Sequence, residues 1–198
     1  MIQLLHNLWR KRGGTAAAEF AFAVPAMLVM FMGVFEVSQA LIVYMKVIDV
    51  ADTISDLVAQ QKQVAESDID NYYIAGQLVM TPSAGSGLGL AVASVIFAAP
   101  NPPPPGCTTG SPCVAWQVTR GGAVAMTNAA AIAAATGLGD TGAGSQDRVI
   151  LAQASYTYNS ALSYLIQKAI SMSATVFSRP RVVFSIPCPP PPSNAPCT

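Results

Sequence analysis

The feature that most constrains this chain is a long apolar run near its amino terminus. Residues 20–35 contain no charged or strongly polar side chain, and mostly small or apolar residues extend the run from Thr15 to Met45. An uninterrupted run of this kind is typical of a membrane-spanning helix rather than of a core helix. The sixteen residues rise about 24 Å along a helix. We therefore expect Glu19 and Glu36 near opposite membrane interfaces, within reach of water in a slightly thinned bilayer.

The charges that flank this run predict its orientation. Three cations precede it, whereas three acids and a single lysine follow it, namely Arg10, Lys11 and Arg12 before it and Lys46, Asp49, Asp52 and Asp56 after it. The positive-inside rule then places the first fourteen residues in the bacterial cytoplasm and the rest of the chain beyond the inner membrane. A cleaved secretory signal peptide is the competing interpretation. The run is too long for one, and Glu19 interrupts its start.

The junction between the basic leader and the apolar run carries a specific pattern. Gly14 ends the leader, four small residues follow, Glu19 is the fifth residue after the glycine, and Phe20 comes next. This pattern resembles the type III signal of type IV pilins and pseudopilins. With Pro25 and Glu36 further along, it is more narrowly similar to the TadE-like family, minor pilins of the tight-adherence (Tad) pilus.

The resemblance implies a processing site and a set of assembly residues. A prepilin peptidase is expected to cut between Gly14 and Thr15, and Glu19, Phe20, Pro25 and Glu36 are expected to act in assembly. In pilins the glutamate is thought to pair with the new terminal amine of a neighbouring subunit, here the amine of Thr15. The alternative for Glu19 is a carboxylate that snorkels to the lipid headgroups. The implied partners are the inner membrane, the peptidase, other Tad pilus subunits and assembly-platform proteins.

Composition and cysteine usage agree with an exported, membrane-tethered chain. Only 10% of the residues are charged and the formal net charge is zero, which argues against nucleic acid as a partner. All four cysteines lie beyond the span, which suits an oxidising periplasm. Short loops cost least to close, so we expect the disulfides Cys107–Cys113 and Cys188–Cys197. A bond between Cys107 and Cys188 is the alternative, and neither short pair has zinc-type spacing.

The patterns predict three regions and an α+β fold. Residues 1–14 form a cytoplasmic leader, 15–65 a transmembrane helix that continues as a stalk, and 66–198 a small periplasmic domain with a mostly antiparallel sheet, short helices and Pro/Gly-rich loops. The stalk helix should reach Gln63. The other expected elements are helices at 67–80, 127–136 and 162–170, and strands at 88–98, 114–120, 149–158, 172–177 and 182–186.

Motifs with catalytic meaning are nearly absent. Gly137 to Gly142 matches G-x-G-x-x-G, but no strand is predicted before it, so a loop is the better interpretation than a dinucleotide site. The triplet Asp140-Thr141-Gly142 occurs once, whereas aspartic-protease chemistry needs two carboxylates. The only histidine is His6, in the leader. We therefore expect no enzyme activity, no cofactor and no metal site. Six aromatic residues beyond the span are expected to pack in the core or across strands, with a binding surface as the alternative, namely Tyr72, Tyr73, Trp116, Tyr156, Tyr158 and Tyr164.

Three functional hypotheses remain. The first is a structural protein, a TadE-like minor pilin or pseudopilin that acts in Tad pilus assembly. The second is an unprocessed, membrane-anchored periplasmic binding or scaffolding module of a secretion system. The third, an anchored enzyme, lacks a catalytic constellation. The spacing from Gly14 to Glu19 favours the first hypothesis over the second, because a mere anchor has no need of it.

Overall fold

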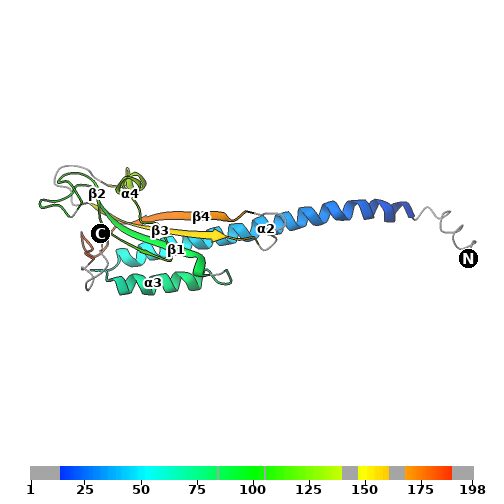
Figure 1. Ribbon diagram of the computed structural model, residues 1–198, viewed down its shortest axis with the longest axis horizontal. Coiled ribbons are helices and arrows are strands. Elements are labelled where there is room, and N and C mark those ends of the chain that lie inside the picture. Colours follow the sequence, from blue (N-terminus) through cyan, green and yellow to red (C-terminus); the bar gives the residue numbers. More distant parts are fainter. Residues whose placement is uncertain (1–13, 84, 105, 140–146, 161–167, 189–198) are drawn as a thin grey trace, which may run out of the picture. The chain divides into compact units, whose positions relative to one another are not determined.

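The computed structural model describes residues 14–83, 85–104, 106–139, 147–160 and 168–188. It confirms the α+β expectation, because one long apolar helix precedes a four-stranded antiparallel sheet and short helices (Figure 1). In chain order the elements are α2 (Gly14–Ala59), α3 (Glu66–Val79), the 3-10 turn η1 (Gly85–Gly87), β1 (Leu88–Ile96), β2 (Cys113–Arg120), α4 (Asn128–Ala135), β3 (Arg148–Tyr158) and β4 (Ile170–Ser178).

The chain divides into two compact units. The first comprises residues 1–41 and 160–168, and the second comprises residues 42–159 and 169–198. The described part of the first unit is the beginning of α2 together with Ser160 and Lys168. The second unit contains the rest of α2, both shorter helices and the whole sheet.

Within the second unit, α2 is amphipathic. Its buried side chains recur every three or four residues, at Val43, Val47, Val50, Ala51, Ile54, Val58 and Ala59. This spacing places them on one side of a helix, so that side packs into the core. The helix ends at Ala59, four residues before the expected Gln63. There the Ala59 carbonyl accepts a hydrogen bond of 2.9 Å from the backbone amide of Arg181, which satisfies one of the last carbonyls of the helix.

Helix α3 begins with a cap supplied by the side chain of Asp68. Its first residue is Glu66, one residue before the expected start at Ser67, and Ala65 occupies the cap position. The Ala65 amide donates to the Asp68 carboxylate at 2.9 Å. Asp68 therefore caps the helix from inside its first turn, because its carboxylate reaches back to an amide that has no partner within the helix.

The sheet has the order β2-β1-β3-β4, and every neighbouring pair is antiparallel. All nine residues of β1 are buried, because helices cover both of its faces. On one face α4 packs over Ala91, Ala93 and Val95. On the other face α3 approaches Leu88, and α2 lies beside β3, where the Ser55 hydroxyl donates to the Ile150 carbonyl at 3.5 Å. In Figure 1, α3 and α4 accordingly lie on opposite sides of the strands.

Two expected elements near the carboxyl terminus differ in the structure. The strand predicted at 182–186 is wrong, because these residues are irregular. Single tertiary hydrogen bonds hold the segment in place of a ladder: the indole of Trp116 donates to the Ile186 carbonyl at 2.8 Å, and the Val64 amide donates to the Pro187 carbonyl at 3.1 Å. The helix predicted at 162–170 is wrong at its end, since Ile170 begins β4, while residues 161–167 lie outside the described part.

The remaining expectations hold closely. The strand predicted at 88–98 ends at Ile96, the strand at 114–120 starts at Cys113, and the strand at 149–158 starts at Arg148. Helix α4 is capped as expected, because the Thr127 hydroxyl accepts from the Ala130 amide at 3.2 Å. It ends before Gly137, whose φ of 82° is a left-handed conformation that favours glycine.

Candidate functional site

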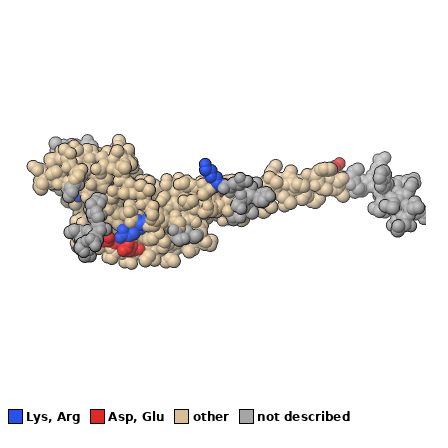
Figure 2. Space-filling model, in the orientation of Figure 1, with Lys and Arg blue, Asp and Glu red and all other residues tan. Residues whose placement is uncertain are grey.

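The candidate functional site is the amino-terminal part of α2. The stretch that begins at Ala17 is long and apolar enough to cross a membrane. Its large side chains are exposed rather than packed in a core, with Phe20 at 66% and Phe22 at 85%. Figure 2 shows little charge on the visible surface of this helix. A continuous apolar surface of this length is stable in lipid or against other apolar helices. These properties are those of a single-pass membrane protein.

The residues expected at the processing and assembly site lie along this one helix. Gly14 is its first residue and Thr15 its second, and the side chains of Glu19 and Phe20 are exposed one turn further on. Pro25 lies inside the helix, which continues past it. Glu36 lies seventeen residues after Glu19, a rise of about 25 Å. The two carboxylates are therefore separate features and do not form a common acid pair.

The environment of Glu36 differs from the expected one. Its side chain is only 1% exposed, and the Ser160 hydroxyl donates a hydrogen bond to its Oε1 atom. The expectation that Glu36 reaches water is therefore wrong, because the chain itself covers it. A buried carboxylate needs hydrogen-bond donors to offset its lost hydration, and Ser160 supplies one. The two residues are 124 positions apart, so the sequence gives no sign of their contact.

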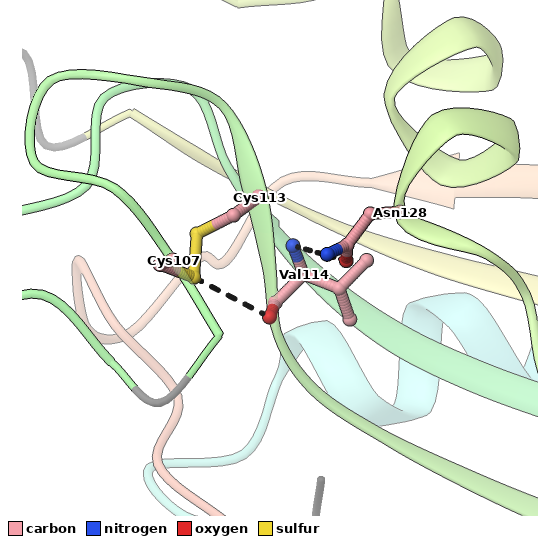
Figure 3. The surroundings of a disulfide bond; sticks show 4 residues. All are labelled: Cys107, Cys113, Val114 and Asn128. Atoms are coloured by element: carbon pink, nitrogen blue, oxygen red, sulfur yellow. Dashed lines mark hydrogen bonds between the residues drawn. A yellow bond between two sulfur atoms is a disulfide. The ribbon is translucent and has the colours of Figure 1, made fainter.

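The Cys107–Cys113 disulfide is present, with 5.6 Å between the two Cα atoms (Figure 3). It ties the preceding loop to the first residue of β2. The next residue, Val114, donates its amide to the Asn128 side-chain oxygen at 3.3 Å, which links the same point to α4. Cys107 Sγ lies 3.7 Å from the Val114 carbonyl oxygen, but a disulfide sulfur has no hydrogen, so this is a packing contact. Cys188 is also disulfide-bonded, while Cys197, its expected partner, lies outside the described residues.

The aromatic residues of the second unit serve mainly in packing. Trp116, Tyr156 and Tyr158 are buried, which confirms the core interpretation for these three, whereas Tyr164 lies outside the described residues. Tyr72 and Tyr73 are partly buried, and the Tyr73 hydroxyl donates to the Leu88 carbonyl at 3.0 Å. The contact joins α3 to the start of β1.

Sequence reasoning missed a charged cluster that joins α3 to β2. The Arg120 guanidinium forms ion pairs with Asp70 and, at 3.3 Å, with Glu66. The hydrogen bond that Arg120 donates to the Asp70 carboxylate is the main reason that the pKa of Arg120 lies above its ordinary value. All three side chains are partly exposed, so the ion pairs contribute little to the free energy of unfolding. Their main effect is to hold the start of α3 beside the end of β2.

The structure adds no support for the glycine motif at 137–142 or for the aspartate triplet within it. Helix α4, and not a strand, precedes Gly137, so a dinucleotide-binding turn lacks its strand. Residues 140–142, which contain the aspartate triplet, lie outside the described part. Within the described ranges, no group of three or more His, Cys, Asp or Glu side chains could hold a metal ion.

The fold and this helix define the class: a membrane-anchored protein with one apolar amino-terminal helix and a small α+β domain. Comparison with protein families then identifies the helix. Residues 14–55 match the family model of TadE-like protein, which confirms the resemblance. The match begins at Gly14, includes Glu19 and Glu36, and ends before the sheet. It supports a membrane protein related to the Tad system. No curated protein and no solved structure matches the chain.

Proposed function

We propose that this protein is a TadE-like minor pilin or pseudopilin, a non-enzymatic structural component of Tad pilus assembly. The observation that carries the proposal is the family match, which begins at Gly14 and includes the glutamate five residues further on. A helix that only anchors a domain needs an apolar surface but not this spacing. The exposed apolar side chains of α2 supply the surface through which such subunits pack against one another.

The proposed maturation step is a cut between Gly14 and Thr15 by a prepilin peptidase of the inner membrane. Glycine has no side chain, so the chain can approach the peptidase closely in an extended conformation. The cut removes the basic leader, leaves residues 15–198 and creates a cationic amine on Thr15. The exposed carboxylate of Glu19 on a neighbouring subunit then pairs with that amine, because an ionised carboxylate at the edge of lipid is stabilised by a cation.

The proposed location follows from the same elements. The amino terminus faces the cytoplasm, α2 crosses the inner membrane once, and the domain lies in the periplasm, as the flanking charges predict. The partners are the peptidase, other Tad pilus subunits and the assembly platform. After processing, the protein is incorporated into a pilus or primes its assembly.

The deciding experiment reads the amino-terminal residue of the mature protein. The full chain is co-expressed with its cognate peptidase, purified from membranes and measured by mass spectrometry. We expect Thr15 at the amino terminus in the wild type and an intact leader in Gly14→Glu. A wild-type protein that keeps residues 1–14 would instead support the unprocessed anchored module.

A second experiment separates the role of Glu19 in assembly from membrane insertion. Glu19→Ala should insert normally but assemble poorly, because the cation of the neighbouring subunit loses its partner. Glu19→Gln is the matched control for shape, since it removes the charge and keeps the size, and it should fail in the same way. Wild-type pilus counts for either variant would remove the proposed role and favour a carboxylate that contacts only headgroups.

A further inference from the structure

A groove lies where the ends of β3 and β4 meet. Two adjoining hollows of about 340 and 400 Å³ share Arg179 and Pro180. Arg148, Arg181, Phe177 and Phe184 also line them. We name these six residues the arginine groove. Three of the cations of the second unit therefore lie around one concave surface together with one acid, Asp147, so the described lining carries a net positive charge.

Two of the three arginines already have partners. Arg179 forms an ion pair with Asp147 at 3.3 Å, and Arg181 forms one with Asp56. Arg148 differs: within the described part of the chain no acid pairs with it, and its Nε atom is buried without a hydrogen-bond partner. Burial also lowers the pKa of Arg148. A partly buried guanidinium without an anionic partner has lost part of its hydration and gained no ion pair in return. A carboxylate from another molecule would supply that ion pair, and its geometry fits the planar donors of arginine.

The groove also offers apolar contact. Phe177 is 48% exposed and Phe184 is 87% exposed, so both rings present large surfaces to solvent. Exposed aromatic rings beside arginines are typical of the centres of protein interfaces. The chemistry of the groove therefore calls for a partner surface that carries carboxylates next to flexible apolar side chains.

The second unit carries such a surface itself. Met45, Asp49 and Asp52 are spaced by four and three residues on α2, so they share one side of the helix. All three are exposed, and the two aspartates form no ion pair within the described residues. We name them the acidic stripe. The thioether of Met45 can pack against aromatic rings, and the carboxylates of Asp49 and Asp52 can pair with guanidinium groups.

We propose that the arginine groove binds the acidic stripe of a second copy of this chain, with Arg148 paired to Asp49 or Asp52 of the neighbour. Within one copy it is Asp56, one turn beyond the stripe, that reaches a groove arginine. The stripe itself is left for another molecule. Because groove and stripe are different surfaces, the contact is head-to-tail, and its repetition gives an open filament or a ring rather than a two-fold dimer; an open filament is the form that suits the proposed pilin. The inference thus deepens the proposed pilin function and rests on it.

The test uses two differently tagged full-length copies that are co-expressed without a prepilin peptidase and co-purified from solubilised membranes. Arg148→Glu in both copies places like charges together and should lower co-purification about tenfold, as should Asp49→Arg with Asp52→Arg in both copies. Placing Arg148→Glu in one copy and the two arginine substitutions in the other should restore it, since each groove then meets a stripe of opposite charge on the other copy. High salt should weaken the wild-type association.

Lys62→Glu is the matched control, because it reverses a charge at an exposed position outside groove and stripe. It should leave co-purification unchanged. The proposal is overturned if Arg148→Glu has no effect, which would mean that copies associate through their apolar helices alone. It is also overturned if the mixed pair stays apart while each variant keeps the wild-type melting temperature. The proposed pilin function is judged separately by the mature amino terminus, so the two failures are distinguishable.

Discussion

Gly76 offers a sharp test of how the second unit is packed. It lies in α3 at the point where that helix meets α2 and β1. A Cβ atom placed on it would lie 3.1 Å from a methyl group of Val50 and 3.2 Å from one of Leu88. The absence of a side chain at this position is therefore what lets the three elements approach so closely.

The magnitude follows from two opposing terms. Replacing a helical glycine stabilises the helix by up to about 1 kcal/mol. For Gly76→Ala, two side-chain methyl groups must move by a few tenths of an ångström, so the two terms nearly cancel. Gly76→Leu forces a branched side chain into the same closed space, and overpacking of this kind costs about 1 to 3 kcal/mol. After the helix gain is subtracted, we expect a net loss of about 1 to 2 kcal/mol, which lowers the melting temperature by about 2 to 8 °C for a domain of this size.

The assay is thermal unfolding of the detergent-solubilised full chain, followed by near-UV circular dichroism. Gly33→Leu is the control for replacing a helical glycine without overpacking, because a Cβ at Gly33 meets nothing within 4 Å, and it should melt at or slightly above the wild-type temperature. If Gly76→Leu also melts like the wild type, α3 does not pack against α2 and β1 as described, and the reasoning fails.

Three further changes test single contacts. Replacing Cys107 and Cys113 by serine should lower the free energy of unfolding by about 1 to 2 kcal/mol, a small loss because the bond closes a loop with a sequence separation of only 6; an unchanged urea midpoint would contradict this. Burial raises the pKa of Tyr72 above its ordinary value of 10.0, so its contribution to stability is present below that pH and is lost as the pH rises through the folded-state pKa. Tyr72→Phe should therefore flatten the alkaline decline of the melting temperature, and an identical decline would refute the assignment. Ser160→Ala removes the hydroxyl that donates to Glu36 and should lower the free energy of unfolding by about 1 to 3 kcal/mol. Ser160→Thr keeps the donor and should lower the free energy of unfolding by less.

Local patterns were sufficient to predict most elements. The strands that begin near residues 88, 114 and 149 were placed within two residues because apolar and β-branched residues cluster between turn signals there. The cap at Thr127 follows from a side-chain oxygen three residues before an orphan amide. Such features depend on neighbours in sequence, which is why the sequence alone specifies them.

Features that depend on distant partners could not be predicted. Val182, Val183 and Phe184 have strand-like side chains, yet none of the strands in the described part of the chain pairs with them, and the Trp116 indole donates to the carbonyl of Ile186 instead. The arginine groove likewise forms only when the ends of β3 and β4 lie side by side. In both cases the sequence shows which side chains are present, but it does not show which distant residues they contact.

The two glutamates of the long helix show why this distinction matters for function. By sequence they look equivalent, one near each end of an apolar run. In the structure Glu19 is exposed, whereas Glu36 is 1% exposed and bonded to Ser160. A carboxylate must be accessible to pair with the terminal amine of another subunit, so Glu19 can make that contact directly. Glu36 is buried and already accepts a hydrogen bond from Ser160, so it does not present its carboxylate to another subunit. The proposed pairing in assembly therefore rests on Glu19, and the structure gives Glu36 an internal role in holding Ser160 against the helix.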